Sequence, residues 1–224
     1  MKTEPRVYVT EKLNNTDNGA VYTVEAVVPE NKPVYAFFKR AFDILVSVVA
    51  GIIMLLPMLV IAVCIKLDSK GPAIFKQERL GKDGKPFVMY KFRSMRVDAE
   101  ANGPQWAVKN DNRVTKVGQI IRAARLDELP QLLNILKGDM SVVGPRPERA
   151  CFYEEFETYI HGFANRLAVT PGLTGLAQVN GGYDLRPEEK VSYDMEYIEN
   201  RSLLLDLKCV LKTVRLVFTH KGAR

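Results

Sequence analysis

The chain has 224 residues, of which 47% are apolar, and a net charge of +6 at pH 7. This length suits one domain of ordinary size, and the basic balance suits a nucleic acid, an anionic membrane surface or a phosphate-bearing substrate. Three scattered cysteines without a CxxC pair, together with only two histidines, His161 and His220, disfavour a disulfide framework, a zinc site and a serine–histidine triad.

The first 35 residues form a predicted polar N-terminal arm. Pro29, Pro33 and the Asn18-Gly19 pair are typical of flexible or turn-forming chain. A short alternation of Val, Tyr and Thr at 21–24 leaves one strand open as an alternative.

An uncharged segment follows the arm. Residues 44–65 are 22 in number and carry no charge, which meets the roughly 20 residues that a membrane helix needs. The segment begins too far from the N-terminus, after Lys39 and Arg40, to resemble a signal peptide. A buried soluble helix is the alternative, although such helices rarely stay apolar on every face over this length.

Two features of this segment favour a helix that enters the membrane and returns to the same side. Pro57 lies near its middle, where proline bends or breaks a helix. Both flanks are also basic, and basic flanks tend to stay on the cytoplasmic side. We therefore predict a re-entrant membrane helix within residues 36–70, with its core at about 40–66. A kinked helix that spans the bilayer is the alternative.

Residues 71–224 are predicted to form the catalytic region. Short strands are expected at 73–75 and 86–90, separated by a turn at 81–84, and a loop is expected at 170–175. A helix is expected over 117–137, with a break before Pro130 and an apolar face of Leu126, Leu129, Leu133 and Leu136; further helices are expected at 151–160, 187–200 and 203–218. The predicted fold class is therefore α+β and mostly helical.

The last of these helices is amphipathic and basic. Its apolar face contains Leu203, Leu207, Val210, Leu211, Val214, Val217 and Phe218, and Lys208, Lys212 and Arg215 lie off that face. Such a helix can rest on anionic lipid or can pack against a core, and the pattern alone allows both.

The densest cluster of ionisable residues is hemmed in by leucines and valines. It comprises Arg122, Arg125, Asp127, Glu128, Asp139, Arg146 and Glu148. A carboxylate can attack phosphorus, and phosphoryl transfer requires cations that neutralise oxygen charge. Neighbouring carboxylates on a helix do not share a face, so Asp127 and Glu128 could divide the labour. Simple ion pairs between them and Arg122 or Arg125 are the alternative.

Several nucleotide and metal motifs are absent from the sequence. It contains no GxxxxGK[ST], no GxGxxG after a strand and no HExxH. The basic segment 76–96, with Phe87, Tyr90 and Phe92 among its cations, would suit a nucleic-acid-binding module. That reading leaves the uncharged segment 44–65 unexplained.

Seven ordered runs resemble the bacterial sugar transferases, the monotopic phosphoglycosyl transferases that begin glycan assembly on polyprenyl phosphate. The resemblance covers residues 36 to 220. The runs are KRAFD at 39–43, GPAIFKQER at 71–79, YKFRSM at 90–95, LDELPQL at 126–132, KGDMS at 137–141, VGPRP at 143–147 and PGLTGLAQVN at 171–180.

The resemblance implies a function and a set of site residues. The family's Asp-Glu pair falls on Asp127 and Glu128. The first would attack the β-phosphate of a UDP-sugar, release UMP and hold the sugar phosphate until polyprenyl phosphate accepts it. The second would help to hold Mg²⁺, which both carboxylates would bind, or would move a proton. The resemblance further implies substrate-binding roles for Arg122, Arg146 and Gln178. It implies the same for Lys91 and Arg93, without deciding which of these two is the active-site cation. It also implies a structural role for Asp43.

The resemblance also implies a location at the cytoplasmic face of a bacterial cell membrane. The expected partners are a UDP-sugar, polyprenyl phosphate and membrane lipids, with no nucleic acid. The identity of the sugar, the glycan pathway and a homo-oligomeric state stay open. A membrane-tethered interaction protein is the rival from another class, and it would release no UMP.

Overall fold

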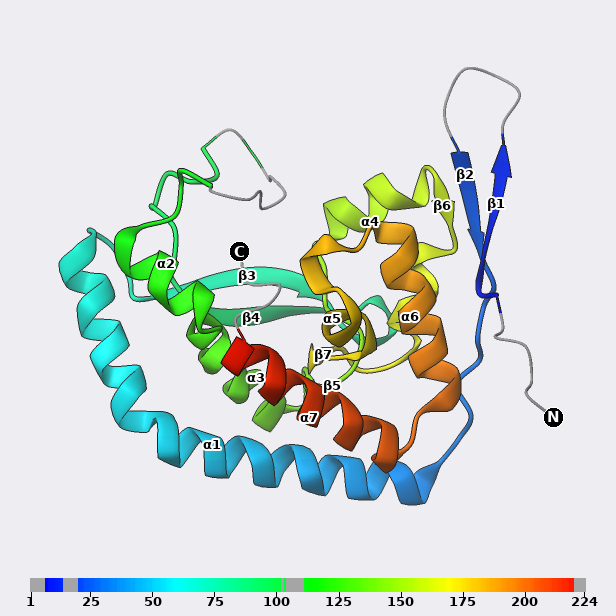
Figure 1. Cartoon of the computed structure of the whole chain (residues 1–224), viewed down its shortest axis with the longest axis horizontal. Helices are drawn as coiled ribbons and strands as arrows, with labels where there is room; N and C mark the ends of the chain where they lie inside the picture. Colours follow the sequence, from blue (N-terminus) through cyan, green and yellow to red (C-terminus); the bar gives the residue numbers. More distant parts are fainter. Residues whose placement is uncertain (1–6, 14–19, 102, 104–110, 220–224) are drawn as a thin grey trace.

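A computed structural model describes residues 7–13, 20–101, 103 and 111–219. The described residues confirm the predicted α+β, mostly helical class, because the strands are short and belong to three small sheets (Figure 1). The elements are β1 (Val9–Leu13), β2 (Ala20–Val24), α1 (Pro33–Asp68), β3 (Ile74–Leu80), η1 (Lys82–Gly84), β4 (Pro86–Phe92), α2 (Lys116–Ala123), η2 (Leu126–Gln131), α3 (Leu132–Lys137), β5 (Ser141–Val143), α4 (Ala150–Glu157), β6 (Ile160–His161), η3 (Phe163–Ala168), β7 (Gly172–Thr174), α5 (Leu176–Asn180), η4 (Gly182–Asp184), α6 (Pro187–Asn200) and α7 (Leu203–Thr219).

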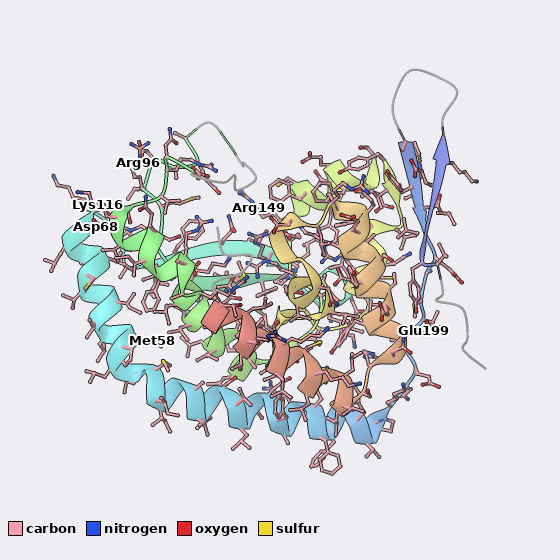
Figure 2. The ribbon with its side chains drawn as sticks, in the orientation of Figure 1. Met58, Asp68, Arg96, Lys116, Arg149 and Glu199 are labelled. Carbon is pink, nitrogen blue, oxygen red and sulfur yellow. The ribbon has the colours of Figure 1, made fainter. Side chains whose placement is uncertain are left out.

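Helix α1 contains the whole uncharged segment. Among the described residues it is the one helix long and apolar enough to cross a membrane. Pro57 lies inside it, and an interior proline removes a backbone hydrogen bond and bends a helix. Figure 1 shows the helix bending near its middle, and Figure 2 places Met58 at the bend and Asp68 at the far end. The two arms of α1 therefore follow two adjacent sides of the body.

The surface of α1 is mostly exposed although it is apolar. Its buried residues are Asp43, Ser47, Ile61 and Ile65, which form one inward stripe on each arm. Ile52, at 71% exposure, faces away from the body with many other large apolar side chains of the helix. A core helix of a soluble protein would bury such side chains, so the packing argues against that alternative.

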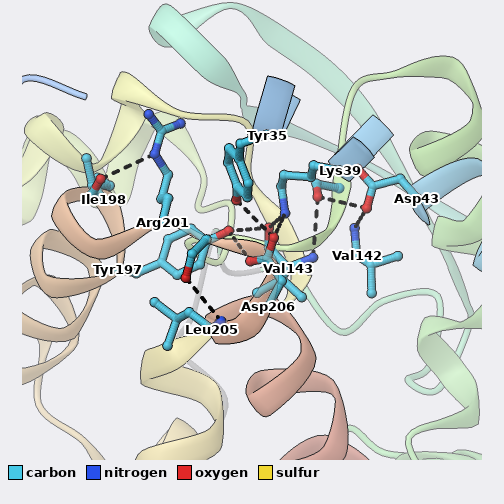
Figure 3. Close-up of polar contacts among 12 residues, drawn as sticks. Tyr35, Lys39, Asp43, Val142, Val143, Tyr197, Ile198, Arg201, Leu205 and Asp206 are labelled. Atoms are coloured by element: carbon cyan, nitrogen blue, oxygen red, sulfur yellow. Dashed lines mark hydrogen bonds and ion pairs between the residues drawn. The ribbon is translucent and has the colours of Figure 1, made fainter. Parts of the chain in front are cut away.

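The N-terminal arm of α1 is held to the body by a cluster of charged and polar groups (Figure 3). Lys39 Nζ lies 3.0 Å from the Asp206 carboxylate of α7 and donates to the Val143 carbonyl at 2.9 Å. The same carboxylate accepts hydrogen bonds from the hydroxyls of Tyr35 at 2.9 Å and Tyr197 at 2.8 Å. Asp206 is therefore fully paired although it is only 3% exposed.

Asp43 provides the next contact along this arm. Its carboxylate accepts hydrogen bonds from the Val142 backbone N–H at 2.9 Å and from the Ser141 hydroxyl at 3.0 Å. Nearby, the Arg40 guanidinium donates to the Ile135 carbonyl at 2.6 Å. These bonds fix the arm against β5 and the end of α3, as expected for a structural role of Asp43.

The C-terminal arm is held mainly by apolar packing. Ile61 and Ile65 form a buried cluster with Phe92 of β4 and Ile121 of α2. This cluster joins the end of the uncharged segment to the strand and the helix that border the site described below.

Arg93 closes the end of the same arm. Its guanidinium donates to the carbonyl of Ser69 at 2.8 Å and to that of Lys70, and a longer contact of 3.4 Å reaches Ile65. A helix leaves its last carbonyls without partners, and a cation there satisfies them. Gly71 follows with φ +120°, and a Cβ at that position would collide with the Arg93 guanidinium.

Strands β3 and β4 form an antiparallel hairpin around the predicted turn, and β3 extends to Leu80, beyond the strand expected at 73–75. Ile74 pairs with Phe92 at one end and Leu80 with Pro86 at the other. Helix α3 is tied to β4 by Asn134, whose side-chain amide donates to the Val88 carbonyl at 2.7 Å and accepts from the Tyr90 N–H at 3.1 Å. Phe92 is buried and Phe87 packs against the core, so these rings do not form a surface for stacking bases.

The predicted helix over 117–137 is broken earlier than expected. Arg125 adopts a left-handed conformation, with φ 56°, between α2 and η2. The 3₁₀ turn then shifts the inward face, since it has fewer residues per turn than an α-helix. Leu132 and Ile135 are buried, whereas Leu133 and Leu136 are exposed. The predicted apolar face was wrong for these last two leucines.

The loop expected at 170–175 contains a strand. β7 pairs in parallel with β5, from Ser141–Gly172 to Val143–Thr174. The two strands run so close together that a Cβ on Gly172 would lie 2.0 Å from the Gly144 nitrogen. This pair lies in the core, beside buried residues of α6 such as Met195 and Ile198.

The polar segment predicted over residues 1–35 is more ordered than expected in its described part. β1 and β2 form an antiparallel hairpin, and β2 pairs in parallel with β6. The alternative of a strand at 21–24 is confirmed, whereas residues 1–6 and 14–19 lie outside the described residues. The hairpin projects away from the body at the end opposite α2 (Figure 1).

Helix α7 turns its polar and small side chains inward. Asp206 and Cys209 are buried, and Thr213 lies 2.6 Å from Thr174 between hydroxyl oxygens. Its predicted apolar face is largely exposed, at Leu203, Leu207, Leu211 and Val214. Packing of that face in the core is therefore wrong for these four residues, and lipid contact remains the prediction.

Candidate functional site

A cavity of about 430 Å³ lies between the β3–β4 hairpin and helices α2, α5 and α6. Cations predominate among the described residues that line it, with ten Lys or Arg against three carboxylates: Arg79, Lys91, Arg93, Arg96, Arg122, Arg125, Arg146, Arg149, Arg166 and Lys190, with Glu100, Asp127 and Glu148. This excess of positive charge suits an anionic substrate such as a diphosphate.

The two predicted catalytic carboxylates point to different places. Both lie in η2, a 3₁₀ turn that directly follows left-handed Arg125. Asp127 lines the cavity, whereas Glu128 is not among the lining residues. The sequence expectation that neighbouring carboxylates would differ in role is consistent with this geometry.

Glu128 lies among cations from two other elements. Its Oε1 accepts a hydrogen bond from the Arg146 guanidinium at 2.6 Å and lies 3.9 Å from Lys91 Nζ. Burial alone would raise the pKa of this carboxyl, but Arg146 and Lys91 together hold it well below its usual range. Glu128 is thus ionised at neutral pH. Its ion pairs reach Arg146 and Lys91, which are distant in sequence, and the nearby charge of Arg125 also lowers its pKa.

Asp127 has the opposite tendency. Burial raises the pKa of its carboxyl and the negative charge of Glu128 raises it further, while Lys91, Arg122 and Arg146 act against that rise. A carboxylate with a raised pKa in a cavity is a common feature of functional sites. The net result is a more basic carboxylate that faces the space where a substrate would bind.

Lys91 lies in β4 and Arg93 directly follows this strand, but the two side chains have different contacts. Lys91 lies beside both carboxylates, and burial together with the charge of Arg146 lowers the pKa of its ammonium to about 8. Arg93 also borders the cavity, but its guanidinium bonds the terminal carbonyls of α1. Of the two, Lys91 is the cation placed beside Asp127 and Glu128.

The remaining predicted residues border different parts of the cavity. Arg122 and Arg146 lie close enough to Asp127 to affect the pKa of its carboxyl. Gln178 lines the side formed by α5. Asp139, from the same ionisable cluster of the sequence, lies apart and accepts a hydrogen bond from the Asn134 amide at 3.2 Å.

A family model described as "Bacterial sugar transferase" matches residues 34–220. The chain belongs to the bacterial sugar transferase family. It is 48% identical over 195 residues to the UDP-N-acetylgalactosamine-undecaprenyl-phosphate N-acetylgalactosaminephosphotransferase of Aeromonas hydrophila, an alignment that covers 86% of this chain and 46% of that protein. It is also 47% identical over 191 residues to a UDP-glucose:undecaprenyl-phosphate glucose-1-phosphate transferase of Klebsiella pneumoniae, covering 83% of this chain and 41% of that protein.

The chain therefore spans less than half the length of these two relatives. The names of the two proteins state different sugars, N-acetylgalactosamine and glucose. Family membership accordingly leaves the sugar of this chain open.

The site suits a hard divalent cation such as Mg²⁺ in part. The described residues contain no cluster of three or more His, Cys, Asp or Glu side chains that could enclose a metal ion. Mg²⁺ commonly takes one or two carboxylates and completes its shell with water and substrate phosphates. Asp127 faces the cavity and fits that mode, whereas Glu128 Oε1 is already bonded to Arg146.

Several residues that border the cavity were not singled out from the sequence. Arg79, in β3, forms an ion pair of 2.7 Å with Glu148. Arg166, in η3, forms a buried ion pair of 2.5 Å with Asp194 of α6. Arg79 lay within a run that carried the family resemblance, but no spacing or motif pointed to Arg166, since only the tertiary fold brings η3 to the cavity.

Proposed function

We propose that this sugar transferase moves a sugar phosphate from a UDP-sugar to undecaprenyl phosphate, and that Asp127 forms the covalent intermediate. The observation that carries the proposal is a basic carboxylate, Asp127, facing a cation-rich cavity beside a bent apolar helix. The names of the Aeromonas and Klebsiella relatives support the two substrates.

In the first step, an Asp127 oxygen attacks the β-phosphorus of the UDP-sugar. A bond forms between that oxygen and phosphorus, and the bond from phosphorus to the bridging oxygen breaks, so UMP leaves with the electron pair. The raised pKa of Asp127 supports this role, because a more basic carboxylate is a better nucleophile once it is ionised.

Cations around Asp127 would stabilise the charge that develops on the phosphate oxygens. Lys91, Arg122 and Arg146 all lie near the carboxylate, as their effects on its pKa require. Their positive charge would also hold the diphosphate of the donor before reaction. This arrangement provides positioning and charge neutralisation, which are the main demands of phosphoryl transfer.

Glu128 would act as the residue that positions two of these cations. Its carboxylate bonds Arg146 and lies near Lys91, so it keeps both at the edge of the cavity. The low pKa of Glu128 disfavours a role as proton donor at neutral pH. Mg²⁺, held by Asp127 and substrate oxygens, would supply further neutralisation of phosphate charge.

In the second step, an oxygen of undecaprenyl phosphate attacks the same phosphorus. A new bond forms between the two phosphates, and the bond to Asp127 breaks and restores the carboxylate. This step requires the acceptor phosphate to reach the cavity while its tail stays in the bilayer.

The contacts of α1 support such a membrane geometry. The N-terminal arm of the helix bonds β5 through Asp43, and the C-terminal arm packs on Phe92 and Ile121. A helix that crossed the bilayer would carry one arm away from the body or would take the body's charged groups into lipid. We therefore propose that both ends of α1 lie on the cytoplasmic side, where a UDP-sugar is available.

The test uses the full chain in detergent or lipid nanodiscs with UDP-sugars, undecaprenyl phosphate and Mg²⁺. Wild type should release UMP and accumulate a phosphosugar on Asp127 when the acceptor is withheld. Asp127→Asn should remove both the release and the adduct. Full transfer by Asp127→Asn would overturn the assigned nucleophile, and absence of UMP release from every UDP-sugar would favour an interaction protein.

A further inference from the structure

The cavity has two ends of different chemistry. The α1-side end is bordered by Ile74, Phe75, Val97 and Arg122, next to the cluster that packs on the C-terminal arm of α1. The far end is bordered by Phe152, Glu148, Arg166, Gln178 and Lys190. Figure 1 shows α2 beside that arm of α1 and shows α5 and α6 toward the other end of the β3–β4 hairpin.

The chemistry of two successive displacements assigns the ends. UMP leaves from the position opposite the attacking Asp127 oxygen, and an in-line acceptor phosphate must then approach from that same position. The acceptor comes from the membrane, so this position has to open toward the α1-side end. The sugar stays bonded to phosphorus through both steps, and it therefore needs a place that neither UMP nor the lipid occupies.

The far end has the composition that sugar hydroxyl groups require. Glu148 provides an acceptor, Lys190 provides donors, and the Gln178 amide provides both. The α1-side end has three apolar side chains, Ile74, Phe75 and Val97, beside Arg122, which suits isoprenoid and phosphate groups. Phe152 adds an aromatic ring to the far end, at 9% exposure.

Two residues at the far end, Gln178 and Arg166, have buried side-chain polar atoms without a hydrogen-bond partner among the described residues. Neither the amide nitrogen nor the amide oxygen of Gln178 has a hydrogen-bond partner in the described part of the chain, although both atoms are buried. The same holds for Arg166 Nε. A buried polar group without a partner is costly, and native proteins tolerate it mainly where a ligand or water completes the bonding.

The Arg166 guanidinium is fixed from behind. It forms an ion pair of 2.5 Å with Asp194, both side chains being at most 2% exposed, and lies 5.0 Å from the centre of the Phe163 ring. Such support holds a side chain in one orientation before the substrate arrives. Arg166 is therefore built into the wall of the far end.

We propose that the far end of the cavity, formed by Phe152, Glu148, Arg166, Gln178 and Lys190, holds the sugar of the donor and decides which UDP-sugar is used. This inference rests on the proposed function, because it assumes that the sugar phosphate is retained between two displacements at Asp127.

Gln178→Leu provides the test, since it keeps the size of the side chain and removes its donor and acceptor. UMP release by the full chain is measured with UDP-glucose, UDP-galactose and their N-acetylated forms, in the presence of undecaprenyl phosphate. The ratio of kcat/KM between the best sugar and its epimer should change by about tenfold or more. The inhibition constant of UMP should stay within about twofold, because UMP occupies the other end.

Asn180→Leu is the matched control, because Asn180 lies on the same helix but bonds Leu176 and Lys212 and does not line the cavity. It should leave the sugar ratio unchanged. Lys190→Met is a second variant and should also alter the ratio if Gln178→Leu does not fold. If wild type is active and neither variant alters its ratio of kcat/KM between sugars, the inference is overturned. It is also overturned if the UMP inhibition constant rises together with the change in that ratio, because the far end would then bind uridine. A wild type that releases no UMP overturns the proposed function as well.

Discussion

The two arms of α1 are attached to the same body by different interactions. The N-terminal arm uses buried charges and hydrogen bonds, with Lys39 on Asp206 and Asp43 on β5. The C-terminal arm uses apolar packing of Ile61 and Ile65, and one guanidinium closes its end. Directional bonds fix position and register, whereas apolar contacts tolerate small shifts. The N-terminal arm should therefore set where the body sits, and the C-terminal arm should transmit changes to the site.

The largest loss of stability is expected from a change at the N-terminal arm of α1. Asp206→Ala would leave Lys39 without its ion-pair partner and would remove the acceptor of Tyr35 and Tyr197. Because breaking a buried pair leaves an uncompensated charge, the free energy of unfolding should fall by about 3–5 kcal/mol. Chemical unfolding in detergent, followed by circular dichroism, measures this loss.

A double variant sharpens that result. Lys39→Met combined with Asp206→Leu should recover part of the lost stability, since it removes the unpaired charge. If the single variant Asp206→Ala unfolded like wild type, the N-terminal arm of α1 would not be the stronger attachment.

Loss of the guanidinium at the end of the C-terminal arm should have the next largest effect. Arg93→Met removes the hydrogen bonds to the carbonyls of Ser69 and Lys70, and hydrogen bonds to a charged group are worth about 1.5–3 kcal/mol. Arg93→Lys should restore only part of this, because an ammonium lacks the planar fork of the guanidinium. Thermal unfolding of the three proteins would show the order, and equal stability of all three would contradict it.

The smallest loss of stability is expected from a substitution in the apolar packing of the C-terminal arm. Ile65→Val removes one buried methylene group from a side chain that is 2% exposed, and the expected cost is about 0.5–1.5 kcal/mol. Ile52→Val, at an exposed position of the same helix, serves as the control and should unfold like wild type. A loss at Ile65 as large as that of Asp206→Ala would erase the contrast between the arms.

The rate of transfer should depend on pH through two groups of the site, Asp127 and Lys91. Asp127 must be ionised to attack, and its pKa is raised above the ordinary aspartate value of 3.8. As the pH is lowered, activity should therefore fall at a higher pH than an ordinary aspartate would give. Lys91 has a pKa lowered to about 8, so its charge and its support of the substrate are lost as the pH rises through that value. A bell-shaped profile of kcat/KM is therefore expected.

Arg93 variants should shift the basic side of that profile, because Arg93 directly follows strand β4, in which Lys91 lies. Loosening the strand would admit water, reduce the burial of Lys91 and raise the pKa of its ammonium toward 10.5. The basic limb should then move to higher pH in Arg93→Met and stay in place in Asp206→Ala. A common shift in both variants would show that the arms are equally coupled to the site.

Much of the secondary structure could be predicted from local patterns. The 22 uncharged residues, Pro57 and the turn at 81–84 correctly indicated the bent helix and the hairpin. The apolar face at Leu133 and Leu136 was wrong because a left-handed residue and a 3₁₀ turn changed the phase before them. Such a change depends on how η2 packs against β4, and helical periodicity alone does not contain it.

The site could be predicted only in part for a similar reason. The family runs pointed to Asp127, Glu128, Lys91, Arg122, Arg146 and Gln178, and the fold brings all of these to the cavity or its immediate edge. The sequence did not separate the environments of Asp127 and Glu128, nor those of Lys91 and Arg93. Burial and contacts with distant segments make these differences, and neighbouring letters in a sequence cannot express them.

The ion pair between Lys39 and Asp206 has a consequence for synthesis of the chain. The two residues are 167 positions apart, so at about 5–20 residues per second the ribosome adds Asp206 on the order of ten to thirty seconds after Lys39. Helix α1 ends at Asp68, so the apolar helix is complete early in that interval, while its lysine still has no carboxylate to meet. Final docking of this arm therefore depends on α7, the last helix among the described residues.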